Sequence, residues 1–196
     1  MPTADEIQTY LAGAWRLMSG RPDGIRMLDV SADGFWNSFF AIVIALPAMV
    51  VGWVTIANDL AMLGDGAPGR LFVVVTLAFV DLMAWIVPLV ALAVMARPLG
   101  VADRFVHLVV ANNWASVLIV WLLLPPALIR LVAPDQRDLA ALISLALFGV
   151  SLVLSWRLMN ATINRGAAPA TAVFVTLLAV SFAVLIALQA LFGLGG

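Results

Sequence analysis

The chain has 196 residues, of which 64% are hydrophobic and only 11% are charged, and its formal net charge is -1. About a quarter of the residues of a soluble domain are charged, so this composition argues against a soluble fold, and the near-neutral charge argues against a nucleic-acid partner. The chain has no cysteine and one histidine, which excludes thiol chemistry and a multi-histidine metal site, and we expect no metal and no cofactor.

The first predicted element is an amphipathic helix over residues 5–19. Its apolar residues recur at the spacing of one helix face: Ile7, Leu11, Ala14, Trp15 and Met18. We expect this helix to lie at the membrane interface, with Trp15 at the level of the lipid headgroups. Two interpretations stay open, namely a short helix packed under the rest of the protein or a surface that binds lipid or a partner.

A break with Gly and Pro at residues 20–24 leads towards the first long apolar block. Asp33 and Gly34 predict a turn before that block, and Phe35 and Trp36 are expected to anchor its start at the membrane interface. We therefore predict an N-terminal segment over residues 1–34 and a transmembrane domain over residues 35–196.

Five apolar blocks make up this second part, at roughly 35–57, 71–96, 105–129, 139–159 and 170–192. Each has about 20 residues or more, which is enough for a helix to cross about 30 Å of hydrocarbon. The sequence therefore predicts an all-α fold, a polytopic bundle of five transmembrane helices with an N-terminal interfacial amphipathic helix.

Small residues form stripes on three of these spans, and we interpret the stripes as contact faces between helices, within the chain or with another copy. They lie on the first, fourth and fifth spans: Ala41, Ala45, Ala48 and Gly52; Ala141, Ser144, Ser151 and Ser155; Ala179, Ala183 and Ala187. Pro47, Pro88 and the pair Pro125 and Pro126 fall inside spans, where proline removes a backbone hydrogen bond and kinks a helix.

The strongest candidate for chemistry is an acid deep in the second span. Asp81 lies about ten residues into it, where a carboxylate facing lipid costs roughly 2.5 to 3.5 kcal/mol, so we expect it to face the bundle interior. Asn112, Asn113 and Ser116 fall at a similar depth in the third span, and we predict that one of the two asparagines hydrogen-bonds to Asp81. The group is either a proton or cation site or a structural contact between helices.

Three further polar residues lie within or at the ends of spans. His107 is close to Asp103 and Arg104 and is either an interfacial anchor or a pH-sensitive group. Arg157 is expected to extend to the lipid headgroups, and Gln189 is expected to contact a neighbouring helix.

The arginines predict an orientation, because basic residues are enriched in cytoplasmic loops. With the N-terminus in the cytoplasm, seven arginines lie on the cytoplasmic side and three on the other. We therefore predict a cytoplasmic N-terminus and a periplasmic C-terminus, in a bacterial inner membrane.

The stretch Asp-Val-Ser-Ala-Asp-Gly-Phe-Trp at residues 29–36, together with this layout, resembles the Yip1 family of integral membrane proteins. The motif positions are Asp29, Asp33, Gly34, Phe35 and Trp36. The chain departs from the family's usual Asp-Leu-Tyr-Gly-Pro-Phe-Trp, because Ala-Asp stands where Tyr would fall and no proline precedes the Phe. The resemblance implies a non-enzymatic protein that organises or scaffolds the membrane.

The alternative of another class is a small ion or proton-coupled solute transporter. Polar residues at mid-depth and proline in three spans favour it, and since five spans are few for a transporter protomer we expect an oligomer. The sequence has no nucleophile, metal or phosphate-binding signature, so we predict no enzyme activity. The expected partners are the lipid bilayer and another copy or membrane protein.

Overall fold

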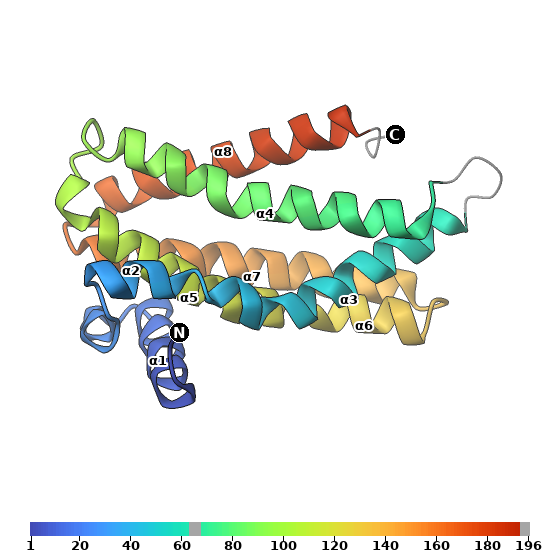
Figure 1. Cartoon of the computed structure of the whole chain (residues 1–196), viewed down its shortest axis with the longest axis horizontal. Coiled ribbons are helices and arrows are strands. Elements are labelled where there is room, and N and C mark those ends of the chain that lie inside the picture. Colours follow the sequence, from blue (N-terminus) through green and yellow to red (C-terminus); the bar gives the residue numbers. More distant parts are fainter. Residues whose placement is uncertain (63–67, 193–196) are drawn as a thin grey trace.

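Every element that the computed structural model describes is a helix, and it describes residues 1–62 and 68–192, without the side chain of Gln189 (Figure 1). The helices are, in chain order, α1 (Ala4–Met18), η1 (Pro22–Met27), α2 (Ala32–Ser38), α3 (Ala41–Ala61), α4 (Arg70–Met95), η2 (Ala102–Arg104), α5 (Phe105–Leu122), α6 (Leu124–Val132), α7 (Arg137–Ile163) and α8 (Ala167–Leu191).

Five stretches of the described chain are long and apolar enough to cross a membrane, namely Ala32–Ala61, Arg70–Met95, Ala102–Val132, Arg137–Ile163 and Ala167–Leu188. Their outward surfaces carry large apolar side chains, such as Val94 on α4 and Leu145 on α7, which are mostly exposed in the protein itself. Lipid covers such surfaces in a membrane. The chain is therefore an integral membrane protein, and the predicted all-α bundle of five spans is confirmed.

The long helices surround a common interior. In Figure 1, α4 and α8 run along the upper side, and α3, α5, α6 and α7 run along the lower side. Contacts between neighbours form a ring: α3 with α4, α4 with α8, α8 with α7, α7 with α5 and α6, and these two with α3. Few contacts join α4 to α5 directly. The centre of this ring holds the cavity described below.

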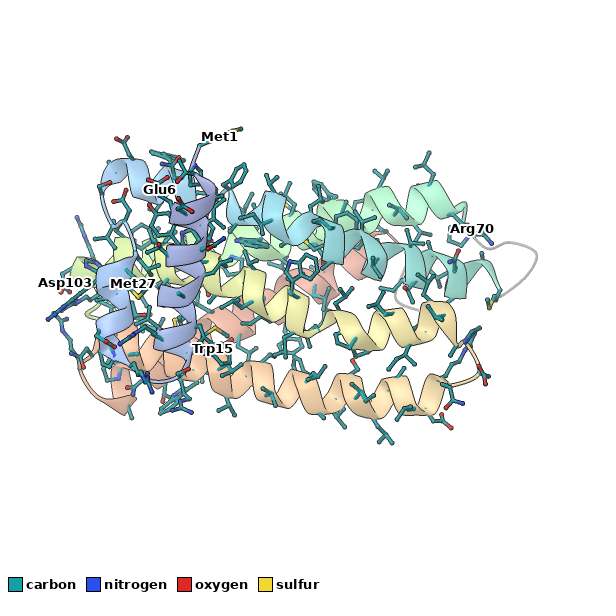
Figure 2. All side chains as sticks on the ribbon, turned by 90° about the horizontal axis from the view of Figure 1, so that it is seen from below. Met1, Glu6, Trp15, Met27, Arg70 and Asp103 are labelled. Atoms are coloured by element: carbon teal, nitrogen blue, oxygen red, sulfur yellow. The ribbon has the colours of Figure 1, made fainter. Side chains whose placement is uncertain are left out.

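The N-terminal helix forms where the sequence predicts it, because Thr3 and Glu6 make a reciprocal capping box at its start. It runs across the direction of the long helices and packs against α5 and α7 (Figure 2). Of the predicted stripe, Ala14 and Met18 are buried, whereas Trp15 is 54% exposed and Leu17 is buried in its place. The buried face is therefore rotated towards Leu17, and the helix is packed against the bundle.

The turn after α1 brings its backbone against η1. Gly13 and Gly24 face one another so closely that a Cβ on either would collide with the carbonyl oxygen of the other. Arg157 on α7 donates a hydrogen bond of 2.7 Å to the carbonyl of Ser19 at the end of α1. Its guanidinium satisfies an open carbonyl at a helix C-terminus, and a contact of the exposed Arg157 with lipid headgroups stays a prediction.

The prediction of a turn at Asp33 and Gly34 is wrong. Ser31 caps α2 by accepting a hydrogen bond from the N–H of Gly34 at 3.1 Å, so the chain is already helical from Ala32, and a boundary after residue 34 falls inside α2. Glycine is needed at position 34 because a Cβ there would collide with the backbone of Asp29.

The prolines act differently from one span to another. Helices α3 and α4 continue through Pro47 and Pro88, whereas the third span divides at Leu123 into α5 and α6. Pro125 and Pro126 stand in the first turn of α6, where a missing N–H costs little. The kink predicted there is thus a break between two helices.

The small-residue stripes have separate outcomes. On α3, Ala41, Ala45 and Ala48 are buried, which agrees with a contact face. On α8, the three alanines of the stripe are exposed, so they make no contact face within the described part of this chain: Ala179, Ala183 and Ala187. On α7, Ser151 is buried, and the outer part of its stripe at Ala141 and Ser144 is exposed.

Candidate functional site

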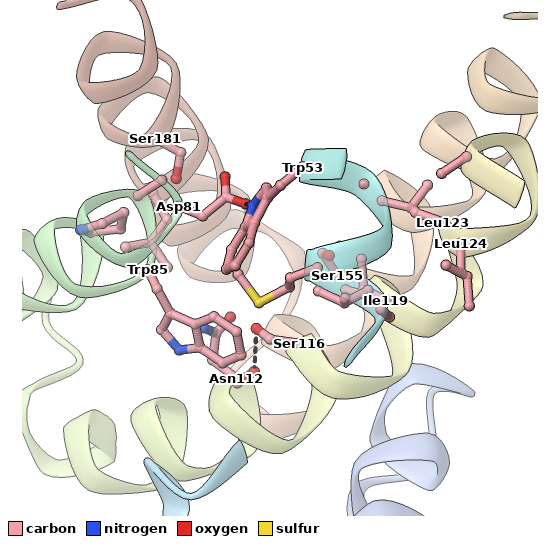
Figure 3. A pocket seen from close by; sticks show the side chains of 18 of the residues that line it. Trp53, Asp81, Trp85, Asn112, Ser116, Ile119, Leu123, Leu124, Ser155 and Ser181 are labelled. Atoms are coloured by element: carbon pink, nitrogen blue, oxygen red, sulfur yellow. Dashed lines mark hydrogen bonds between the residues drawn. The ribbon is translucent and has the colours of Figure 1, made fainter. Parts of the chain in front are cut away.

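A cavity of about 470 Å³ lies at the centre of the ring, with walls from α3, α4, α5, α6, α7 and α8 (Figure 3). Its size falls within the range of small-molecule sites, which is about 300 to 1,000 Å³. Most lining side chains are apolar, and Asp81 is the one charged side chain among the described residues that line it.

Asp81 lies on the cavity wall, as the cost of a carboxylate in lipid predicts. Its Oδ2 accepts a hydrogen bond of 2.7 Å from the indole Nε1 of Trp53 on the neighbouring helix α3. This bond holds the carboxyl group at the interior of the ring.

The predicted hydrogen bond between Asp81 and an asparagine is wrong. Asn113 is fully buried, and its Oδ1 accepts from Nε1 of Trp85 at 3.0 Å while its Nδ2 donates to Oγ of Ser38 at 2.9 Å. Because α4 contacts α3 and α8 far more than α5, a donor on α3 meets the acid and the asparagines do not.

The bonds of Asn113 belong to a polar chain at the α1 end of the cavity. The hydroxyl of Ser38 in turn donates to the carbonyl of Phe35 at 2.7 Å. Consecutive hydrogen bonds between side chains therefore join α4, α5 and α2. Such a satisfied buried network holds its members in one arrangement. It defines the α1 end of the candidate site.

The remaining polar groups are spread over three walls. Asn112 lines the cavity, and Ser116 lines it one turn later, with its hydroxyl donating to the carbonyl of Asn112 at 2.8 Å. Ser155 on α7 and Ser181 on α8 add hydroxyls from two further helices (Figure 3). Of the predicted polar set, the structure thus places Asp81, Asn112 and Ser116 around one cavity and puts Asn113 behind it.

A second cavity of about 800 Å³ adjoins the first, since Gly52, Ile56, Leu123 and Ala127 line both. It extends between α3, α6 and α7 away from the α1 end, and its charged lining residues are Arg130, Arg137 and Asp138. The two cavities together extend from Asp81 towards the end of the bundle opposite α1.

An ion-pair cluster joins three helices beside this second cavity. Asp59 on α3 pairs with Arg130 on α6, and its Oδ1 lies 3.7 Å from Arg137 on α7. The cluster ties α3 to both α6 and α7 at that end of the bundle.

The predicted pH-sensitive residue lies apart from the cavities. His107 is in the first turn of α5 and lines neither of them, and its Nδ1 has no hydrogen-bond partner among the described residues. A role for it as a pH sensor stays a prediction, and a contact of the Gln189 side chain lies outside the described residues.

The motif positions at the start of the first span have local structural roles. Asp29 accepts a hydrogen bond from the N–H of Ser31 at 2.9 Å, and Gly34 packs on Asp29. The ring of Phe35 lies 5.2 Å from that of Trp36 and 6.3 Å from that of Phe105, while Trp36 remains 72% exposed. Asp33 is exposed in the first turn of α2.

The sequence does not predict the hydrogen bonds that Trp53, Trp85 and Ser38 make. The signal that points to the first two is general, because an indole N–H inside an apolar span needs an acceptor and polar side chains at depth are few. No local signal identifies Ser38, whose partner is 75 positions away.

Comparisons with known proteins add no family: no protein-family model, no curated protein and no solved structure matches the chain. No group of three or more His, Cys, Asp or Glu that could hold a metal ion occurs among the residues searched, which are those that the structure describes.

Proposed function

We propose that this protein is a non-enzymatic transporter for a small ion or solute and that the cavity around Asp81 is its substrate site. The observation that carries the proposal is a carboxylate on the wall of a cavity at the centre of a ring of spanning helices. Intramembrane acids are costly, and in membrane proteins they commonly mark the path of an ion or substrate.

The second cavity supports a route to this site from one side. With the N-terminus in the cytoplasm of a bacterium, as the arginines favour, the ion-pair cluster of Asp59, Arg130 and Arg137 lies on the periplasmic side. The polar chain of Trp85, Asn113 and Ser38 then lies between Asp81 and the cytoplasm. This arrangement is that of a transporter facing the periplasm, and a second copy would supply the additional spans common in transporters.

Flux measurements test the proposal. Proton, sodium and potassium flux into liposomes is compared for the unchanged protein, Asp81→Asn and Asp135→Asn at matched incorporation. Asp135 is a suitable control because it is exposed in the turn between α6 and α7 and lines neither cavity. We expect flux that disappears in Asp81→Asn and persists in Asp135→Asn. Flux that is equal in all three proteins contradicts the proposal, and flux that is absent from the folded unchanged protein contradicts an inorganic ion as the substrate.

A second candidate is the membrane-organising role that a Yip1-like protein would have. The exposed Trp36, held by the cluster of Phe35, Phe39 and Phe105, supports it, because an aromatic side chain presented at the start of a span suits an interface with lipid or a partner. Vesicles reconstituted with the unchanged protein would then change in diameter or shape under electron microscopy, and those with Trp36→Ala would not. Identical vesicles with and without protein count against this role.

A further inference from the structure

The described walls of the cavity carry one ionisable side chain, and it is an acid. Asp81 stands alone among apolar and neutral polar lining residues, without a basic side chain on the described walls. The carboxylate would repel an anionic ligand, whereas a cationic ligand would compensate its charge in an environment of low dielectric. Because the Trp53 indole binds Oδ2, Oδ1 is left for a ligand. The charge of the site therefore selects a cation.

The walls are poorly suited to a divalent metal ion. Calcium and magnesium take six or more oxygen ligands, and here one carboxylate is accompanied by the amide of Asn112 and by hydroxyls on three separate helices. The hydroxyl of Ser116 also points back to its own helix, where it donates to the carbonyl of Asn112. A divalent metal ion in this cavity would have a single anionic side chain among its possible ligands.

The same walls suit an apolar body that carries a positive charge. Trp53 and Trp85 lie on either side of Asp81 in the lining, and indole faces attract cations (Figure 3). Further along the cavity, Ile119, Leu123 and Leu124 offer aliphatic surface. The volume of about 470 Å³ accepts a molecule far larger than a hydrated ion.

We propose that the substrate of this cavity is a lipophilic organic cation, whose charged centre lies at Asp81 and whose apolar groups contact the tryptophans and the aliphatic wall. That the bound cation is also transported rests on the proposed function, and the inference adds the chemical class of the substrate.

Two probes of equal shape and opposite charge test it. Tetraphenylphosphonium and tetraphenylborate are titrated against the purified full-length protein in lipid nanodiscs, and saturable binding is measured after subtraction of empty discs. We expect saturable binding of tetraphenylphosphonium alone. The affinity should fall by about tenfold or more in Asp81→Asn, because the buried charge pair is lost, and should persist in Asp81→Glu and Asp135→Asn.

Two results overturn the inference: equal binding of both probes, or tetraphenylphosphonium binding that is the same in Asp81→Asn as in the unchanged protein. If Asp81→Asn fails to fold, as judged by circular dichroism and gel filtration, the two probes on the unchanged protein and on Asp81→Glu still decide the outcome.

The same preparations separate this inference from the proposed function. Saturable binding of tetraphenylphosphonium without its uptake into proteoliposomes supports the binding class and contradicts transport. Flux of protons or metal cations that depends on Asp81, without any tetraphenylphosphonium binding, supports transport and contradicts the organic-cation class.

Discussion

Asp81 and Trp53 form the contact on which the candidate site depends. The indole N–H is a neutral donor, and inside the ring it takes the place of the water that would otherwise solvate the carboxylate. The two residues are 28 positions apart on neighbouring helices, so their contact also joins α3 to α4.

Replacing Trp53 with Phe should therefore reduce both stability and transport. The ring is retained but the donor to Asp81 is lost, and we expect the free energy of unfolding to fall by about 1 kcal/mol or somewhat more. Denaturant titration in mixed micelles and Asp81-dependent flux measure the two effects. Trp156→Phe is the control, since that indole donates to the hydroxyl of Thr171 at a more exposed position. Equal losses in the two variants would contradict a special role for Trp53.

The adjacent asparagines offer a second matched comparison. Asn113→Ala leaves the indole of Trp85 without its acceptor and the hydroxyl of Ser38 without its donor, and it should cost about 1 to 3 kcal/mol of unfolding free energy. Asn112→Ala removes a side chain that faces the cavity, and we expect less than about 0.5 kcal/mol. Denaturant midpoints of the two variants in the same micelles provide the measurement, and a larger loss for Asn112→Ala would refute the assignment of the buried network.

At the scale of elements, the stability of α1 depends on hydrogen bonds to two carboxyl groups that titrate, those of Glu6 and Asp23. The hydrogen bond from Arg16 lowers the pKa of the Asp23 carboxyl, and the hydrogen bonds from the backbone and side chain of Thr3 lower the pKa of Glu6. A carboxyl with a lower pKa in the folded state stabilises the fold above its unfolded-state pKa. That contribution is lost as the pH falls towards the folded-state value.

As the pH falls, α1 should accordingly unfold locally before the long helices do. We expect hydrogen exchange of the α1 amides, corrected for intrinsic rates, to increase below about pH 4, while the amides of α7 stay protected. Asp23→Asn should show part of this increase already at pH 6, because it lacks the ion pair with Arg16 at every pH. Protection of α1 that does not change between pH 6 and pH 3 would contradict this account.

At the scale of the whole molecule, the two adjoining cavities and the positions of the arginines together define a direction. At the end of the bundle that carries Asp59, Arg130 and Arg137, the second cavity leads to the cavity around Asp81. The other end of the bundle is covered by α1 and by the hydrogen-bonded side chains around Asn113. The side of the membrane from which the cavity is reached therefore depends on the orientation of the protein. One set of cysteine-labelling experiments tests both.

The absence of cysteine makes this test direct, because an introduced cysteine is the sole thiol in the sequence. A membrane-impermeant maleimide added to intact cells should label Ser144→Cys, which lines the second cavity. It should label Ser19→Cys at the end of α1 only after the membrane is permeabilised. Labelling of Ser19→Cys in intact cells would reverse the predicted orientation.

Much of the fold follows from local pattern. Apolar runs of about 20 residues must become helices in a membrane, since each backbone polar group has to be satisfied within its own segment. For the same reason a lone acid such as Asp81 is expected to point inward. The capping residues Thr3 and Ser31 also act over three positions only, although the sequence predicts a turn where Ser31 caps the start of α2.

What the sequence by itself determined is therefore the class of protein, the five spans, the amphipathic α1 and the inward placement of Asp81. The tertiary structure decided which helix lies beside which, and with it the partners of each polar side chain. Asp81 bonds to Trp53 and Asn113 bonds to Trp85 and Ser38 because α3 lies next to α4 and α2 lies against α5. Apolar helices in lipid have many nearly equivalent ways to pack, and the choice among them depends on the fit of small and polar residues over the whole bundle.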